Sequence, residues 1–279
     1  MGDWTTREGG QKNKLATNTD FSTTSAYKTV ATSGTAHTKG AYVEMIDAVD
    51  HAISLLVLHL SSSFSLTEFL VDISVGAGGS EVVVIPNILV PAYSTFIGNI
   101  QAFVVPFSVP SGTRISARAQ GDNAGTKNCR VGVNAISCGF LPAGPLNRCV
   151  NYGSVPATTR GKPIDADGVA NTMGAYVEMT GSAVNRVRQI VACWTMNGNS
   201  NPSNAYFIGE IGIGTGGSER VVVPGMWMRT VGVGSNLTNW LQGPFPVDIA
   251  KAERIAVRVQ TDITDATDRV LGCALLCFD

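Results

Sequence analysis

The hexapeptide "GAYVEM" occurs twice in this chain of 279 residues, at residues 40–45 and again at residues 174–179. The offset between the copies is 134 residues here, and it drifts only to 138 and 140 in the blocks that follow. Those blocks keep their order: "VGAGGSEVVVIP" (75–86) with "IGTGGSERVVVP" (213–224), and "RISARAQ" (114–120) with "RIAVRVQ" (254–260). Because the repeated blocks keep their order and only short insertions separate them, the sequence predicts that the same fold occurs twice in the chain.

The residue pattern within each copy is typical of β-strands. "RIAVRVQ" alternates polar and apolar residues with period two, and "EVVVIP" (81–86) is dense in β-branched residues. "ISLLVLHL" (53–60) is apolar on both faces, which favours a central strand and leaves a short helix open as an alternative. About eight strand-like runs per copy, separated by turn residues, predict an all-β protein of two tandem antiparallel β-sandwich domains of jelly-roll type.

Composition changes along the chain suggest four regions. We expect an extended N-terminal arm at 1–39, a β-sandwich at 40–140, a linker at 141–173 and a second sandwich at 174–279. The arm is rich in Thr, Ser, Ala, Gly and Lys, so it cannot bury enough apolar area to offset its ordering entropy. We therefore expect it to lie against a neighbouring subunit, with Trp4 as the docking anchor.

The chain is short of charge. It is 44% hydrophobic and 15% charged, against about 25% charged in an ordinary soluble protein. Uncharged polar residues or other protein must then cover much of the surface. The net charge is −1 without a basic stripe, so we expect no nucleic-acid partner. No apolar run reaches the ~20 residues that span a bilayer, so we expect no membrane partner either.

The six cysteines do not suggest a disulfide framework or a metal site. Only Cys138 and Cys277 correspond between the copies, and residues 1–14 contain no apolar stretch of the kind a secretory signal has. We expect buried free thiols. Because the three histidines lie far from the Cys273–Cys277 pair in sequence, we expect no metal and no cofactor.

Catalytic residues do not repeat between the copies. The second copy has no histidine, so no Ser/His/Asp set can be present in both. Carboxylates such as Asp47, Asp50, Asp72 and Glu81 could make a glycosidase pair. However, the second copy has Glu210 at the position equivalent to Asp72 and Asn185 at the position equivalent to Asp50. No carboxylate pair is therefore present unchanged in both copies. We expect a protein that is not an enzyme.

The glycine-rich block has two interpretations. A phosphate-binding loop would need a following helix and usually a lysine, whereas here a β-branched strand follows and no lysine is present. The other interpretation is a tight turn between strands, with glycine at positive φ. It is favoured because turn chemistry explains every residue, namely Gly76, Gly78, Gly79, Gly214, Gly216 and Gly217.

The repeated arginines share one face of their strand. Arg114 and Arg118 have the same parity, as do Arg254 and Arg258, and Gln120 and Gln260 extend these faces. One interpretation is a ligand-binding strip, for example for sugar. The favoured one is a structural ion pair with a carboxylate. We expect Arg118 to pair with Glu44, and Arg258 with Glu178.

The pattern "DISVGAGGSEVVVIPN … VPSGTRISARAQ" resembles jelly-roll structural proteins of tailed-bacteriophage particles. The resemblance covers both copies but not the arm. It implies a virion component, often a homotrimer, that is assembled in the host cytoplasm and sits on a capsid, neck or tail.

Together these observations predict a non-enzymatic structural protein. The first expectation is a capsid decoration or cement protein that docks on the particle and stabilises it, with itself and the major capsid or tail proteins as partners. The alternative is a tail or fibre component that binds a host-surface glycan. From another class, a glycan-degrading enzyme is the outside alternative.

Overall fold

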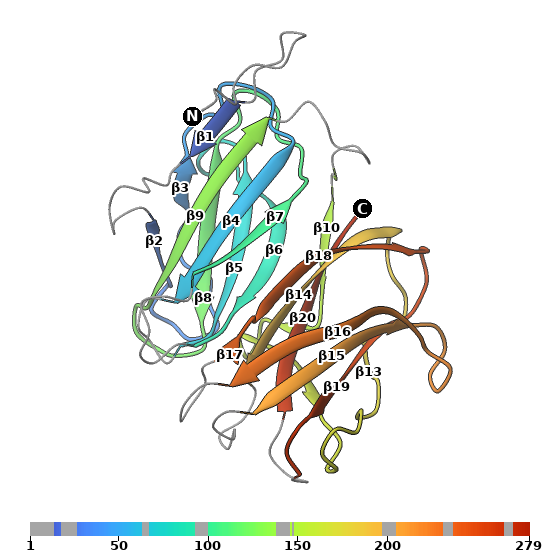
Figure 1. The fold of residues 1–279 in the computed structure, drawn as a ribbon. Coiled ribbons are helices and arrows are strands. Elements are labelled where there is room, and N and C mark those ends of the chain that lie inside the picture. The colour runs from blue at the N-terminus through green and yellow to red at the C-terminus, as the bar shows by residue number, and fades with distance from the viewer. Residues whose placement is uncertain are drawn as a thin grey trace, which may run out of the picture.

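The computed structural model describes residues 14–17, 27–62, 67–92, 100–137, 146, 148–196, 205–230, 237–264 and 270–279. Within these ranges the chain is all-β, with several antiparallel sheets and no helix (Figure 1). The same ranges accordingly contain no helix that could cross a membrane.

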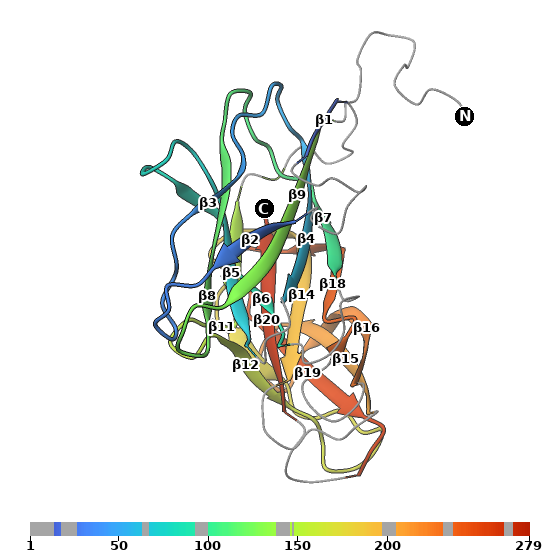
Figure 2. The same cartoon turned by 90° about the vertical axis from the view of Figure 1, so that its left-hand side faces the viewer.

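The first half of the chain forms two sheets. In one, β1 and β2 both pair with β9, and the order continues through β4 to β7; the other has the order β3-β8-β5-β6. Figure 2 shows the two sheets as two layers, with β3 and β8 on one side and β4 and β9 on the other. The strands are β1 (Lys14–Thr17), β2 (Lys28–Ala31), β3 (Val43–Ile46), β4 (Leu55–Ser62), β5 (Phe69–Val75), β6 (Val82–Val90), β7 (Gln101–Val105), β8 (Ile115–Gly121) and β9 (Asn128–Ser137).

The second half of the chain forms another two sheets. In one, β10 and β12 pair with β20, β11 pairs with β12, and the order continues through β14 to β18; the other has the order β13-β19-β15-β16-β17. The strands are β10 (Cys149–Tyr152), β11 (Ser154–Val155), β12 (Arg160–Asp165), β13 (Val177–Thr180), β14 (Val187–Met196), β15 (Tyr206–Ile213), β16 (Arg220–Thr230), β17 (Leu237–Thr238), β18 (Leu241–Ile249), β19 (Ile255–Thr261) and β20 (Val270–Phe278).

The strand orders of the two halves correspond. The order β3-β8-β5-β6 is matched by β13-β19-β15-β16, and β2-β9-β4-β7 by β12-β20-β14-β18. The registers agree as well: Glu44 lies opposite Ser116 and Glu178 opposite Ala256, and each pairing shifts at a bulge directly after that glutamate. The repeated blocks of sequence therefore occupy equivalent places in equivalent sheets.

Strand burial follows from the apolar pattern. The run 53–60 forms β4 and not a helix, and its residues alternate between buried and half-buried. In β14 the seven residues from Ile190 onward are buried on both faces, and β20 is buried from Leu271 to Phe278. Such two-sided burial requires a layer of protein on each side of the sheet.

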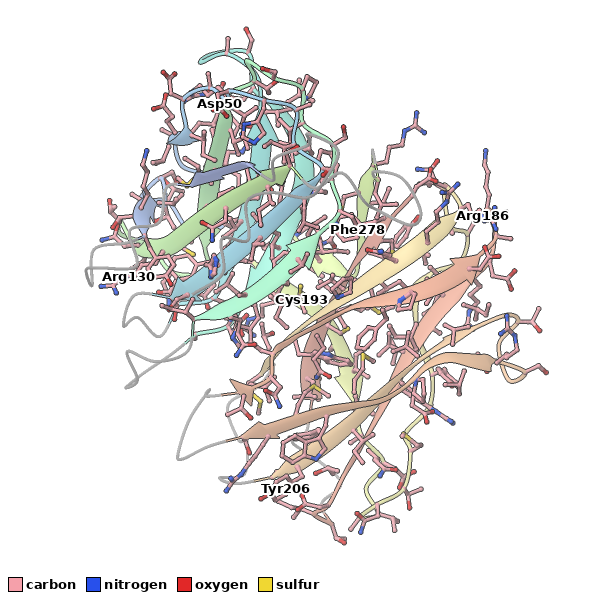
Figure 3. The ribbon with its side chains drawn as sticks, turned by 45° about the horizontal axis from the view of Figure 1, so that its top comes forward. Asp50, Arg130, Arg186, Cys193, Tyr206 and Phe278 are labelled. Carbon is pink, nitrogen blue, oxygen red and sulfur yellow. The ribbon has the colours of Figure 1, made fainter. Side chains whose placement is uncertain are left out.

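The second layer over β14 and β20 is the first half of the chain. Strand β6 packs against β10, β14 and β20, and β7 packs against β18. Figure 3 shows Cys193 and Phe278 at this junction. Trp194 points the other way, since a Cβ on Gly209 of β15 would meet its ring at 3.0 Å. One continuous cluster of buried apolar side chains therefore includes both halves.

The structure changes two of the predicted boundaries. Residues 28–31, assigned to the arm, form β2 and pair with β9, as do residues 14–17 in β1. Much of the predicted linker at 141–173 forms β10, β11 and β12, which add to the sheet of β20. These short strands lack apolar periodicity, and backbone pairing with β9, β12 or β20 holds them in the sheets.

Candidate functional site

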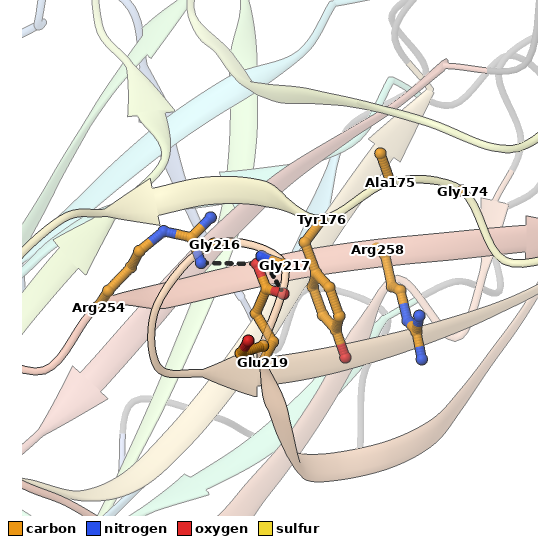
Figure 4. Close-up of a pocket in the computed structure, with 9 residues that line it drawn as sticks. Gly174, Ala175, Tyr176, Gly216, Gly217, Glu219, Arg254 and Arg258 are labelled. Carbon is orange, nitrogen blue, oxygen red and sulfur yellow. Dashed lines mark hydrogen bonds and ion pairs between the residues drawn. The ribbon is translucent and has the colours of Figure 1, made fainter.

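A recess on the second sandwich is lined by residues that recur in the first (Figure 4). It has a volume of about 520 Å³ and is formed by the segment entering β13, the turn between β15 and β16, and strand β19. Its lining is Gly174, Ala175, Tyr176, Gly216, Gly217, Ser218, Glu219, Arg254 and Arg258. The equivalent residues of the first copy are the same nine types: Gly40, Ala41, Tyr42, Gly78, Gly79, Ser80, Glu81, Arg114 and Arg118.

One arginine of each copy ties the three segments together. Arg254 donates from Nε to Glu178 Oε2 at 2.8 Å and from Nη1 to Glu219 Oε1 at 2.8 Å. Arg114 makes the same two bonds, to Glu44 at 3.0 Å and to Glu81 at 2.9 Å. Because each carboxylate comes from a different segment, these bonds fix the turn and the hexapeptide strand relative to β8 and β19.

The second arginine has a different partner from the one predicted. Arg118 donates to Asp72 Oδ2 at 2.9 Å, and Arg258 donates to Glu210 at 2.7 Å. The expected pairs with Glu44 and Glu178 are wrong, because those carboxylates hold the other arginine. The reason is register: Asp72 lies directly opposite Arg118, and cross-strand neighbours on one face are within reach of each other.

A tyrosine packs on the second arginine in each copy. The guanidinium carbon of Arg258 lies 4.4 Å from the ring centroid of Tyr176, and that of Arg118 lies 4.6 Å from Tyr42. Both arginine side chains are partly buried, at 29% and 30% exposure. The tyrosine and the carboxylate together hold each arginine in one position.

The glycine-rich turns have the predicted backbone geometry at four of six positions. Gly76, Gly79, Gly214 and Gly217 have φ between 82° and 114°, a conformation that side chains disfavour. The Ser80 N–H donates to Ala77 O at 2.9 Å and the Ser218 N–H to Thr215 O at 3.0 Å, which closes each turn.

The other two glycines need another explanation. Neither Gly78 nor Gly216 has a positive φ, and a Cβ on either would meet nothing within 4 Å. The turn itself therefore does not require glycine at these positions. Gly216 also borders a second recess of about 610 Å³ on the other side of the turn.

The charges in the site are stabilised in their ionised forms. The hydrogen bond from Arg254 lowers the pKa of Glu219, and the backbone N–H of Gly217 adds to this effect. In the first copy, backbone N–H groups and Arg114 lower the pKa of Glu81. The bonds to Glu219 and Glu178 in turn raise the pKa of Arg254. The lowered pKa values favour the ionised carboxylates of Glu81 and Glu219 in their pairs with Arg114 and Arg254.

A second cluster of polar side chains lies where the two sandwiches meet, and the sequence patterns did not indicate it. Glu68, which enters β5, is 5% exposed. Its Oε2 lies 3.8 Å from Arg160 Nε, beyond hydrogen-bond distance. Burial raises the pKa of Glu68 to about 8, and the nearby carboxyl group of Asp122 acts in the same direction.

Gln120 belongs to this cluster and not to a ligand-binding strip. It is 2% exposed and donates to Pro156 O at 2.7 Å and to Thr159 Oγ1 at 2.9 Å. The Thr159 hydroxyl is also 2.9 Å from His37 Nδ1. Gln260, the equivalent residue, is only half-buried. Sequence could not reveal this difference because it depends on how the halves dock.

Other expectations are only partly testable within the described ranges. Cys129, Cys149, Cys193, Cys273 and Cys277 are free thiols, as predicted, whereas Cys138 lies outside the described residues. Trp4, the expected docking anchor, lies outside them too. Within the described ranges, no three His, Cys, Asp or Glu side chains gather closely enough to hold a metal ion.

Comparison with known proteins gives little guidance. No protein-family model matches the chain, and no curated protein is a significant match. Two solved structures of PNGF-II, in space groups P21 and C2, align with TM-scores of 0.36 and 0.35 and identities of 12% and 11%. The alignments cover 91% of this chain, which spans just under two thirds of those chains, at 66% and 65%. Nothing about activity follows from a likeness this distant.

Proposed function

We propose that the chain is a non-enzymatic structural protein of a tailed-phage virion, and specifically a decoration or cement protein that docks on the capsid and stabilises it. Its partners are then further copies of itself, in a homotrimer, and the major capsid protein. Trp4, in the segment before the first strand, is the anchor in this proposal.

The strand order supports the jelly-roll part of the proposal. Strands β2 to β9 divide between the two sheets, with β2-β9-β4-β7 on one side and β3-β8-β5-β6 on the other, and among them only β5 and β6 are consecutive strands of one sheet. This is the order of an eight-stranded jelly roll, a fold used in viral capsids. The second half repeats it, so we interpret the chain as two tandem jelly-roll domains.

The observation that carries the proposal is the shared buried core. The apolar cluster runs through both sandwiches without interruption, so the two equivalent surface sites are held on one block. A rigid block with repeated surfaces suits attachment to a particle whose own surface repeats. The low charge of the chain, 15%, also suits a protein that other subunits partly cover.

The alternative of a tail or fibre component is favoured by one feature, the open recess beside Tyr176. Aromatic, arginine and glutamate side chains around a recess of this size are compatible with glycan binding.

The test is stoichiometry on the particle. Purified particles of the phage whose genome encodes the chain would be analysed by quantitative mass spectrometry, with the major capsid protein as the internal standard. We expect hundreds of copies per particle, and a Trp4→Ala variant should reduce the occupancy. A handful of copies would support the tail or fibre alternative, and absence from the particle would overturn the virion role.

A further inference from the structure

We propose that the recess beside Tyr176 is a binding site for an uncharged saccharide, and that the same nine residue types around Tyr42 form a second such site. This inference does not rest on the virion role, because it concerns the chemistry of the isolated chain.

The first argument is the retention of the whole lining. All nine residue types around the second recess recur in the first copy, although they come from three separate segments. Elsewhere the copies differ freely: β5 reads "FLVDISV" and β15 reads "YFIGEIGI". The core tolerates exchange between the copies, whereas this surface does not.

The second argument is the balance of charge in the recess beside Tyr176, which indicates an uncharged ligand; beside Tyr42 the carboxylate of Asp72 is shared by Arg118 and Lys39. Arg254 is paired with two carboxylates, and Arg258 is bonded twice to Glu210. An anion would have to compete with these carboxylates, and a cation with these guanidinium groups. A neutral hydroxyl group can bind without displacing either the carboxylates or the guanidinium groups from their ion pairs.

The third argument is that hydrogen-bonding capacity remains. A guanidinium carries five N–H donors. Among the described residues, Arg254 donates only from Nε and Nη1, and Arg258 only from Nε and Nη2. Donors are thus left beside carboxylate oxygens that can accept. A sugar hydroxyl both donates and accepts, so it fits such alternating groups.

The fourth argument is the bare backbone of the turn. Gly78 and Gly216 lack a side chain although neither the backbone conformation nor the space around them demands it. A side chain at Gly216 would enter open space at the edge of the recess that this residue lines. Glycine keeps the backbone open to close approach by a bound ring.

Variants at these two glycines test the proposal without disturbing the scaffold. Gly78→Gln and Gly216→Gln each place an uncharged side chain into open space at one of the two proposed sites. Val104→Gln is the matched control, because Val104 is 38% exposed and lies in β7, on the opposite sheet of the first sandwich. Thermal unfolding of every variant would confirm that the fold is kept.

The probe is an array of neutral oligosaccharides ending in glucose, galactose, mannose or N-acetylglucosamine, printed beside sialylated ones. We expect the wild type and Val104→Gln to bind at least one neutral glycan. Each single glycine variant should lose at least tenfold in apparent affinity through loss of bivalence, and the double variant should lose binding.

Three results would overturn the proposal. These are no binding of any neutral glycan by the wild type, binding of sialylated glycans alone, or unchanged binding by the folded double variant. None of them bears on the virion role, which the copy number on the particle decides.

Discussion

Glu68 is a carboxylic acid that the fold keeps largely protonated at neutral pH. Its surroundings come from both sandwiches: Asp122 precedes β9, Arg160 begins β12, and the Thr195 hydroxyl of β14 lies beside the carboxyl group. Burial is the largest cause of the raised pKa, and Arg160 opposes it only in part. Asp122 has its own pKa raised by burial. The junction therefore contains two acids that resist ionisation.

Replacing Glu68 by Gln should make the protein more stable at pH 8. The folded-state pKa of about 8 lies above the usual glutamate value of 4.5. The folded state therefore holds this proton longer than the unfolded state. As pH rises from about 4.5 to 8, stability should fall by up to about 1.4 kcal/mol per pH unit through this group. The amide cannot ionise, so Glu68→Gln should lack this contribution.

The measurement is the free energy of unfolding by urea at pH 5, 6.5 and 8, for the wild type and for Glu68→Gln. The difference between the two proteins should grow with pH in favour of the variant. Asp47→Asn, at an exposed position, is the control and should show no such trend. A difference that does not change with pH would mean that Glu68 ionises normally.

At the scale of the element, the turn between β15 and β16 separates two roles of glycine. Gly217 has a φ of 82° and is required by the backbone, whereas Gly216 has no such constraint. Both are followed by Glu219, whose carboxylate accepts from the Gly217 N–H at 3.0 Å and from Arg254. The Glu219 carboxylate thus connects the backbone of the turn to Arg254.

We predict opposite effects of alanine at these neighbouring positions. Gly217→Ala should destabilise the protein by about 1 kcal/mol or more, because a Cβ is strained at positive φ. Gly216→Ala should be neutral or stabilise by about 0.5 kcal/mol, since it restricts only the unfolded chain. Urea unfolding of the two variants at pH 7 checks this. Equal destabilisation by both would show that Gly216 has a structural role.

The hexapeptide, the turns and the arginine strands could be predicted from sequence because their signals are local. Period-two alternation, β-branched runs and glycine at fixed turn positions act within a few residues. The carboxylate partners could not be assigned, because they depend on strand register: Glu44 lies opposite Ser116, two positions from Arg114 and two from Arg118. The polar cluster around Gln120 was beyond prediction, because it forms only when the two sandwiches dock.

At the scale of the whole molecule, the two sandwiches depend on each other. Cys193 and Thr195 alternate with Trp194 along β14. The Cys193 thiol lies beside the backbone of Leu89 in β6, and Trp194 faces the core of the second sandwich. Both faces of β14 are thus buried, the Cys193 face under the first half of the chain and the Trp194 face under the second.

The second half should not be stable alone, despite its complete set of strands. Residues 148–279, expressed without the first half, would expose the face of β14 and β20 that β6 covers. We expect aggregation or strong binding of a hydrophobic dye, measured by size-exclusion chromatography and fluorescence. The full chain should instead unfold in one calorimetric transition. A monomeric, dye-free fragment with native near-ultraviolet circular dichroism would contradict this.

The shared core also fixes the distance between the two arginine–tyrosine sites. Because the two arginine–tyrosine sites belong to one rigid body, their separation and relative orientation are fixed at folding and do not adjust to a partner. A partner with a single copy of the matching feature gains one contact, whereas a partner with a regular repeat gains two only when its period equals that separation. Under the proposed role, the protein should therefore bind more tightly to a partner whose repeat matches this separation than to one with a different repeat.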